Sequence, residues 1–164
     1  MPLRGRKGSE FDGGLCVPWI ASWPRTIPAG VECATRPVTS ICFRLLLAVG
    51  GVKAPDRALD GIDLLPVFKD PAAEVAKRTL FWHLPAYSAF NEPSVIARKG
   101  DWKMIRRLHR DETLLFQTGD DIGEAHDRTS LNAPIAESLQ CEAGQWLDDL
   151  DAPRMRPNPE YRRR

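Results

Sequence analysis

Few residues in this sequence have the types and spacing that chemistry requires. Asp120-Asp121 and Asp148-Asp149 are pairs of hard oxygen ligands, the kind that calcium or magnesium prefers. No third and fourth oxygen ligand lies near either pair, so we expect a loop turn at the first and a solvated helix end at the second. His109 and His126 have no partner pattern. The sequence therefore predicts no metal site.

The four cysteines, Cys16, Cys33, Cys42 and Cys141, are scattered and form no C-x-x-C pair. Neither a zinc knuckle nor a dense disulfide framework is supported. The formal net charge of +1 gives no reason to expect a nucleic acid or an anionic membrane as partner. No apolar run approaches the roughly 20 residues that a spanning helix needs. The N-terminus lacks the apolar stretch of a signal peptide, and neither compartment nor oligomeric state can be inferred.

The elements that must position any functional side chain are clearest in the second half. Strand-like runs at 79–84, 94–98, 102–108 and 113–117 predict a β-meander, with a hairpin at Lys99-Gly100-Asp101. Alternation places Trp102, Met104, Arg106 and Leu108 on one face of the third strand, and Lys103, Ile105 and Arg107 on the other.

Apolar residues at three- and four-residue steps predict a helix that Asn132 caps and that packs across this sheet. The stripe comprises Ile135, Leu139, Ala143, Trp146, Leu147 and Leu150.

In the first half, Leu15–Trp23 is apolar at both odd and even positions, which predicts a strand covered on both faces. Residues 39–50 predict a short buried helix, with Ser40 as its N-cap.

Seven segments, taken in order, resemble the C-terminal portion of the sulfatases of the alkaline-phosphatase superfamily. They are RGRKGSEFDGGLCVP (4–18), WPRTIPAG (23–30), LDGIDLLP (59–66), LFWHLPAY (80–87), ARKGDWK (97–103), DDIGE (120–124) and PNPEY (157–161). Three departures stand out. Cys16 replaces the usual arginine, residues 39–50 lose an Asp and a Pro-Thr pair, and Ile122 replaces a proline.

The resemblance implies an α/β plus α+β fold. Residues 1–78 would be the incomplete end of an alkaline-phosphatase-like α/β core. Residues 79–150 would form the C-terminal subdomain, a four-stranded antiparallel sheet packed by a C-terminal helix, and residues 151–164 a tail. Family members are commonly periplasmic or secreted.

The resemblance also implies hydrolysis of a sulfate ester of a carbohydrate or aryl group. The complete family enzyme uses a formylglycine, made in a C/S-x-P-x-R motif, and a calcium ion. This chain contains neither the C/S-x-P-x-R motif nor the calcium-binding motif. In Cys16–Ile20 (CVPWI) an isoleucine occupies the place of the arginine. We therefore expect the chain alone to be inactive and to hold no cofactor.

Two residues are candidates for the site. Lys7 matches the family lysine that contacts the sulfate group, where an ammonium stabilises anionic oxygens. By composition alone, Lys7 would be a solvated surface lysine. His83 follows Phe81-Trp82 in a part of the subdomain that can approach the active-site mouth, so it could contact the substrate. The alternative is a core histidine that the backbone satisfies.

Two other functions stay open. The chain could be a non-catalytic remnant or a module that binds sulfated glycans, which binding without hydrolysis would favour. It could also derive from a phosphoesterase of the same superfamily. That alternative requires Ser/Thr nucleophile and zinc-ligand motifs upstream, and the segments LFWHLPAY and ARKGDWK argue against it.

Overall fold

The computed structural model describes residues 2–33, 41–56, 59, 61–70, 72–73 and 76–154. The chain divides into two compact units, Met1–Val17 with Arg78–Arg164, and Pro18–Lys77. The domain boundaries after residues 78 and 150 stay predictions. The expected cap at Ser40 and the end of the tail, residues 155–164, lie outside the described residues.

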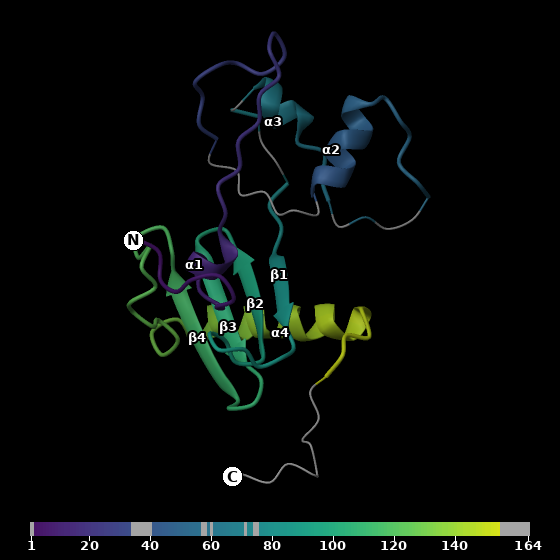
Figure 1. Cartoon of the computed structure of the whole chain (residues 1–164). Coiled ribbons are helices and arrows are strands. Elements are labelled where there is room, and N and C mark those ends of the chain that lie inside the picture. Colours follow the sequence, from purple (N-terminus) through teal and green to yellow (C-terminus); the bar gives the residue numbers. More distant parts are fainter. Residues whose placement is uncertain are drawn as a thin grey trace. The chain divides into compact units, whose positions relative to one another are not determined.

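The first unit contains the predicted meander as a four-stranded antiparallel sheet of order β1-β2-β3-β4 (Figure 1). Its strands are β1 (Leu80–Leu84), β2 (Ser94–Lys99), β3 (Trp102–Arg107) and β4 (Glu112–Gln117). Gly100 joins β2 to β3 with a φ of +60°, a conformation that suits glycine. The sequence expectation of four strands is confirmed.

One face of the sheet packs against the long helix α4 (Ala133–Asp149). The buried core between them consists of Val95, Ala97, Met104 and Leu115 from the sheet and Ala136, Leu139, Ala143 and Leu147 from the helix. Trp146 extends this contact to the edge strand, where its ring stacks on Phe81 with the centroids 5.1 Å apart. Two details differ from expectation. Leu150 is 56% exposed, and the Asn132 side chain makes no capping bond.

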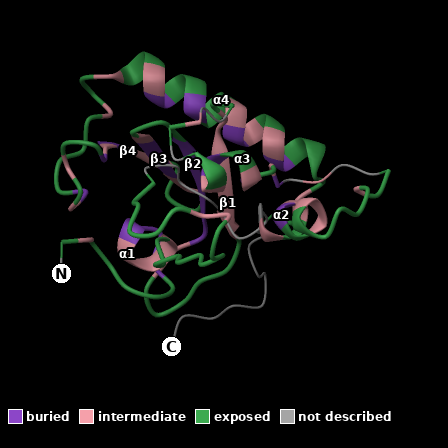
Figure 2. Ribbon diagram, turned by 90° about the horizontal axis from the view of Figure 1, so that it is seen from above, coloured by how far each residue is buried: buried purple, intermediate pink, exposed green. Residues whose placement is uncertain are grey.

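The opposite face is covered by the N-terminal segment, which includes the short helix α1 (Asp12–Leu15). Phe11 packs edge-on against Phe116, with the ring centroids 6.2 Å apart, beside the buried Ile96 and Ile105. Figure 2 shows α1 and α4 on opposite sides of the sheet. The sheet is therefore the middle layer of three, and its third layer comes from the start of the chain.

In the described residues of the second unit, the helices are α2 (Ile41–Val49) and α3 (Leu65–Lys69). The strand expected at Leu15–Trp23 is wrong, because Leu15 ends α1 and the residues after it have no regular structure. Val17 is 72% exposed and Ile20 is 89% exposed, and the sheet in the described residues contains no strand that pairs with this run. Within those residues, no helix is long and apolar enough to span a bilayer.

Candidate functional site

Lys7 lies on an exposed loop that begins the N-terminal segment. Hydrogen bonds close the loop, from Ser9 N–H to the Arg6 carbonyl (2.9 Å) and from Gly13 N–H to the Arg4 carbonyl (2.8 Å). Gly8 turns the loop with a φ of +90°. The Arg6 guanidinium lies 3.9 Å from the centre of the Phe90 ring. The loop is thus held at both ends, and it leaves the Lys7 side chain in solvent.

A buried cluster of four charges holds this segment on the sheet. Lys103 Nζ donates to Asp12 Oδ1 at 2.7 Å and to Glu124 Oε1 at 2.6 Å. The Arg98 guanidinium donates to Asp12 Oδ2 at 2.9 Å and to the Thr118 hydroxyl at 2.6 Å. The side chains of Lys103 and Glu124 are 1% and 0% exposed. Two carboxylates and two cations balance, which buried charges require.

The cluster joins three of the segments that carry the family resemblance. Asp12 comes from the first, Arg98 and Lys103 from the hairpin segment, and Glu124 from the acidic turn. The carboxylate of Glu124 also accepts the backbone N–H of Asp12 at 2.7 Å. Three segments that resemble the family in sequence therefore meet at one buried cluster in this chain.

The glycines beside Asp12 permit the close backbone contact on which the cluster depends. A Cβ atom on Gly13 would lie 2.5 Å from the Arg4 carbonyl oxygen, and one on Gly14 would lie 2.3 Å from the Ser9 carbonyl oxygen. Any other residue would push the loop that carries Lys7 away from α1.

The pKa values of the two carboxylates in the cluster are shifted in opposite directions. Burial tends to raise the pKa of Asp12, but Lys103 and Arg98 together outweigh burial and lower it. Burial also raises the pKa of Glu124, where Lys103 and the Asp12 N–H offset it only in part. The negative charge of the cluster is thus best stabilised on Asp12, which has two cationic partners.

His83 lies on β1 opposite Val95 and is partly buried. Side chains alternate along a strand, and Phe81 packs on the helix-facing core while Trp82 packs on the other side. His83 therefore faces the helix side, and the N-terminal segment with Lys7 covers the opposite face. Burial, followed by the nearby charge of Arg154, lowers the pKa of His83. The structure does not bring Lys7 and His83 to the same face.

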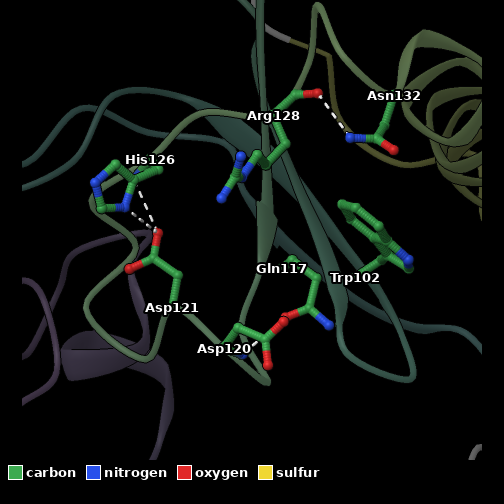
Figure 3. Close-up of a pocket in the computed structure, with 7 residues that line it drawn as sticks. All are labelled: Trp102, Gln117, Asp120, Asp121, His126, Arg128 and Asn132. Carbon is green, nitrogen blue, oxygen red and sulfur yellow. Dashed lines mark hydrogen bonds and ion pairs between the residues drawn. The ribbon is translucent and has the colours of Figure 1, made fainter.

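A third feature is a pocket of about 410 Å³ where β3 begins and β4 ends (Figure 3). Its lining residues are Trp102, Gln117, Asp120, Asp121, His126, Arg128 and Asn132. His126 pairs with Asp121, Nδ1 to Oδ2, at 3.4 Å. Hydrogen bonds from the backbone N–H groups of Ala125 and His126 lower the pKa of Asp121. The pairing of His126 with Asp121 was not predicted from the sequence, because a five-residue separation within a loop matches no known pattern.

The described residues contain no group of three or more His, Cys, Asp or Glu side chains that could hold a metal ion. Asp120 and Asp121 instead belong to the turn that leads to Glu124, where the Glu124 N–H donates to the Asp121 carbonyl at 3.0 Å. Asp148 and Asp149 end α4. Neither pair provides the oxygen ligands that calcium requires.

Removal of the buried cation should release the N-terminal segment. Lys103→Met leaves Glu124 buried without a cation, and breaking a buried ion pair typically costs about 3–5 kcal/mol of unfolding free energy. Urea unfolding should show this loss. The matched control is Lys99→Met, because Lys99 makes an exposed ion pair with Glu142 that contributes about 0–1 kcal/mol. Equal losses in the two variants would contradict the role of the cluster.

Asp12 should also make stability depend on pH. Because its folded pKa lies below the ordinary value of 3.8, its stabilisation is complete above that pH and is lost as the pH falls through the folded pKa. The difference in unfolding free energy between the wild type and Asp12→Asn should be constant from pH 5 to 7 and should shrink below about pH 4. Urea unfolding at each pH measures it, and a difference that grows toward acid pH would refute this assignment.

No protein-family model matches the chain. Curated relatives do. A sulfatase from Formosa agariphila is 29% identical over 168 residues, which cover 93% of this chain and 30% of the relative. Arylsulfatase A from Bos taurus is 37% identical over 165 residues, which cover 84% of this chain and 31% of the relative. The chain thus spans less than a third of these relatives.

Solved structures show a similarity to the same kind of protein. Ps i-CgsB in complex with k-i-k-neocarrahexaose is similar with a TM-score of 0.71 and 25% identity, over 88% of this chain and 32% of the other. BT4656 in complex with its substrate D-glucosamine-2-N,6-O-disulfate has a TM-score of 0.65 at 20% identity, over 79% of this chain and 27% of the other, which shows a shared fold. The chain is related over most of its length to the C-terminal portion of the sulfatases, with the fold expected from its sequence.

Proposed function

We propose that the chain serves as the C-terminal part of a sulfatase that hydrolyses sulfate esters of carbohydrates. The observation that carries this proposal is the convergence of three family-like segments on the buried cluster of Asp12, Arg98, Lys103 and Glu124. A chain that keeps four mutually dependent charges keeps the structure that presents Lys7. The oligosaccharide bound to the similar Ps i-CgsB structure supports a carbohydrate rather than an aryl substrate.

In this proposal, Lys7 binds the sulfate group. Its ammonium is exposed on a loop that hydrogen bonds close at both ends. A cation held in this way needs little reorganisation as negative charge develops on the sulfate and leaving-group oxygens. The buried cluster sets the position of the loop, and Lys7 makes the contact.

His83 would contact the sugar from the edge of the sheet. Its pKa is lowered by burial and then by the charge of Arg154, so the imidazole is neutral near pH 7 and can both donate and accept hydrogen bonds. Those are the contacts that sugar hydroxyls require. Because His83 and Lys7 project from different faces of the sheet, the substrate would reach His83 around the edge strand β1.

The nucleophile and the metal ion would come from outside these residues. The chain has no C/S-x-P-x-R motif, and the described residues offer no group of metal ligands. Calcium does not fit the side chains in the described part of the chain, so we assign both the calcium ion and the formylglycine to the N-terminal portion of a complete enzyme. The isolated chain should therefore be inactive.

A second function is a glycan-binding module without catalysis. The observation that favours it is the pocket whose lining includes Trp102, Gln117, Arg128 and Asn132, because an aromatic ring beside amide and guanidinium groups suits a sugar. Turnover by a complete enzyme that contains this chain would decide against it.

The role of Lys7 can be tested in a chimera in which this chain replaces the corresponding part of the Formosa agariphila sulfatase. With a sulfated oligosaccharide as substrate, Lys7→Ala should lower kcat about 10²–10³-fold, the usual cost of losing one donor to a developing oxyanion. Lys99→Ala should leave kcat unchanged. Unchanged turnover in Lys7→Ala would disprove the assignment, and turnover by the isolated chain would disprove its inactivity.

The role of His83 predicts a different kinetic change. In the same chimera with a sulfated oligosaccharide, His83→Gln should raise KM about fivefold to tenfold, the cost of one hydrogen bond, and should leave kcat and the unfolding midpoint unchanged. His109→Gln, which removes a histidine paired with Glu92, should change neither constant. A lower unfolding midpoint with an unchanged KM would mean that His83 is only a core residue.

A further inference from the structure

We propose that the pocket between the start of β3, the end of β4 and the loop before α4 binds an uncharged sugar residue of the glycan chain. This inference rests on the carbohydrate substrate proposed above, and it adds a third contact with the substrate, separate from Lys7 and His83. The pocket of about 410 Å³ lies within the usual range of small-ligand sites, about 300–1,000 Å³.

Trp102 provides the surface on which a sugar ring would pack. Its indole is partly exposed and lines the pocket, while its other contacts reach the helix-side core. A large rigid ring loses little entropy on binding, and its face accepts the C–H groups of a sugar's apolar side. In Figure 3 the indole and the amide of Gln117 lie next to each other.

The polar groups around the indole offer both donors and acceptors. The Gln117 amide oxygen accepts the backbone N–H of Asp120 at 2.8 Å, which leaves its NH₂ group free to donate. The Asn132 amide donates to the Arg128 carbonyl at 3.4 Å, which leaves its oxygen free to accept. Within the described residues, the side chains of Arg128 and Asp120 have no hydrogen-bond or ion-pair partner. Sugar hydroxyls need this mixture, since each one donates and accepts.

The rim of the pocket is already ordered. Both oxygens of Asp121 accept backbone N–H groups, from Ala125 at 3.1 Å and from His126 at 2.8 Å. Glu124, three residues after Asp121, belongs to the buried cluster, where it accepts a hydrogen bond from Lys103. The loop that shapes the pocket is therefore held at the same point as the N-terminal segment. A preformed site loses less free energy when it binds.

The charges of the lining favour an uncharged sugar over a sulfated one. Asp120 and Asp121 carry two negative charges, and Arg128 carries one positive charge. His126 adds a positive charge only when it is protonated, and its nearest charged neighbour is Asp121. Apart from His126, the lining thus carries one more negative charge than positive charges, which disfavours a sulfate group and tolerates hydroxyls.

The Trp102 wall of the pocket lies on a different side of the sheet from the segment that carries Lys7. Trp102 belongs to the helix-facing side of β3, whereas the segment that carries Lys7 covers the other face. A glycan chain could therefore place its sulfated residue near Lys7 and a hydroxyl-rich residue in the pocket only by passing around the edge of the sheet. Only an oligosaccharide could reach both places, since a monosaccharide is too short to do so.

The test is an NMR titration of the ¹⁵N-labelled full chain with three neutral hexasaccharides, neoagarohexaose, cellohexaose and chitohexaose. At least one should shift the Trp102 indole N–H and the side-chain amides of Gln117 and Asn132. Trp102→Leu keeps the apolar packing and removes the ring, and Arg128→Ala removes the guanidinium. Each should weaken binding at least tenfold. The matched control Arg110→Ala, in an exposed turn at the other end of β3 where Arg110 pairs with Glu92, should change nothing.

Three outcomes would overturn the proposal. These are no shifts with any neutral hexasaccharide at 10 mM, shifts that lie outside the pocket, and binding of k-i-k-neocarrahexaose alone. Trp102→Phe guards against misfolding of the leucine variant, because it should retain binding. The titration involves no hydrolysis, so its failure leaves the sulfatase assignment intact. Failure of the chimera with successful sugar binding would instead favour the non-catalytic module.

Discussion

The charge balance among Asp12, Arg98, Lys103 and Glu124 is the interaction on which the first unit depends. Lys103 is completely buried, and an ammonium in such a place is tolerated only with anions in direct contact. Those anions come from the start of the chain and from the turn after β4. Each element therefore needs the other two. The sheet keeps its lysine because the N-terminal segment is present, and the segment stays in place because the lysine is there.

This interdependence gives the two candidate sites a common support. The Lys7 loop precedes Asp12 by a few residues, and the rim of the pocket precedes Glu124 by a few residues. Both are exposed, and both continue directly into the same buried cluster. A substitution in the cluster would thus disturb the Lys7 loop and the pocket together, although it lies in neither. Loss of activity at Asp12 or Lys103 is no evidence of a catalytic role for these residues.

Sequence reasoning predicted the sheet and its helix because their signals are local. Alternation along β3 correctly predicted that the side chains of Met104 and Lys103 lie on opposite faces of the sheet. The burial of Lys103 could not be predicted, since its partners Asp12 and Glu124 lie 91 and 21 residues away in the sequence. The one available signal was that these charges belong to different family-like segments. Leu15–Trp23 was predicted wrongly because apolar composition shows that a segment can be buried and does not show what covers it. His126 paired with Asp121 through a loop conformation that periodicity cannot reveal.

The long sequence separation within the cluster has a consequence for the order of folding. Asp12 meets Glu124 across 112 residues and Arg98 across 86. During synthesis at about 5–20 residues per second, the N-terminal segment waits on the order of 5–20 s before its last partner exists. The hairpin β2-β3 and helix α4 are local and can form early, whereas contacts between distant residues form slowly. The N-terminal segment is therefore the last part of this unit whose contacts can all form, and during that interval the Asp12 carboxylate lacks the cations that balance it in the folded cluster.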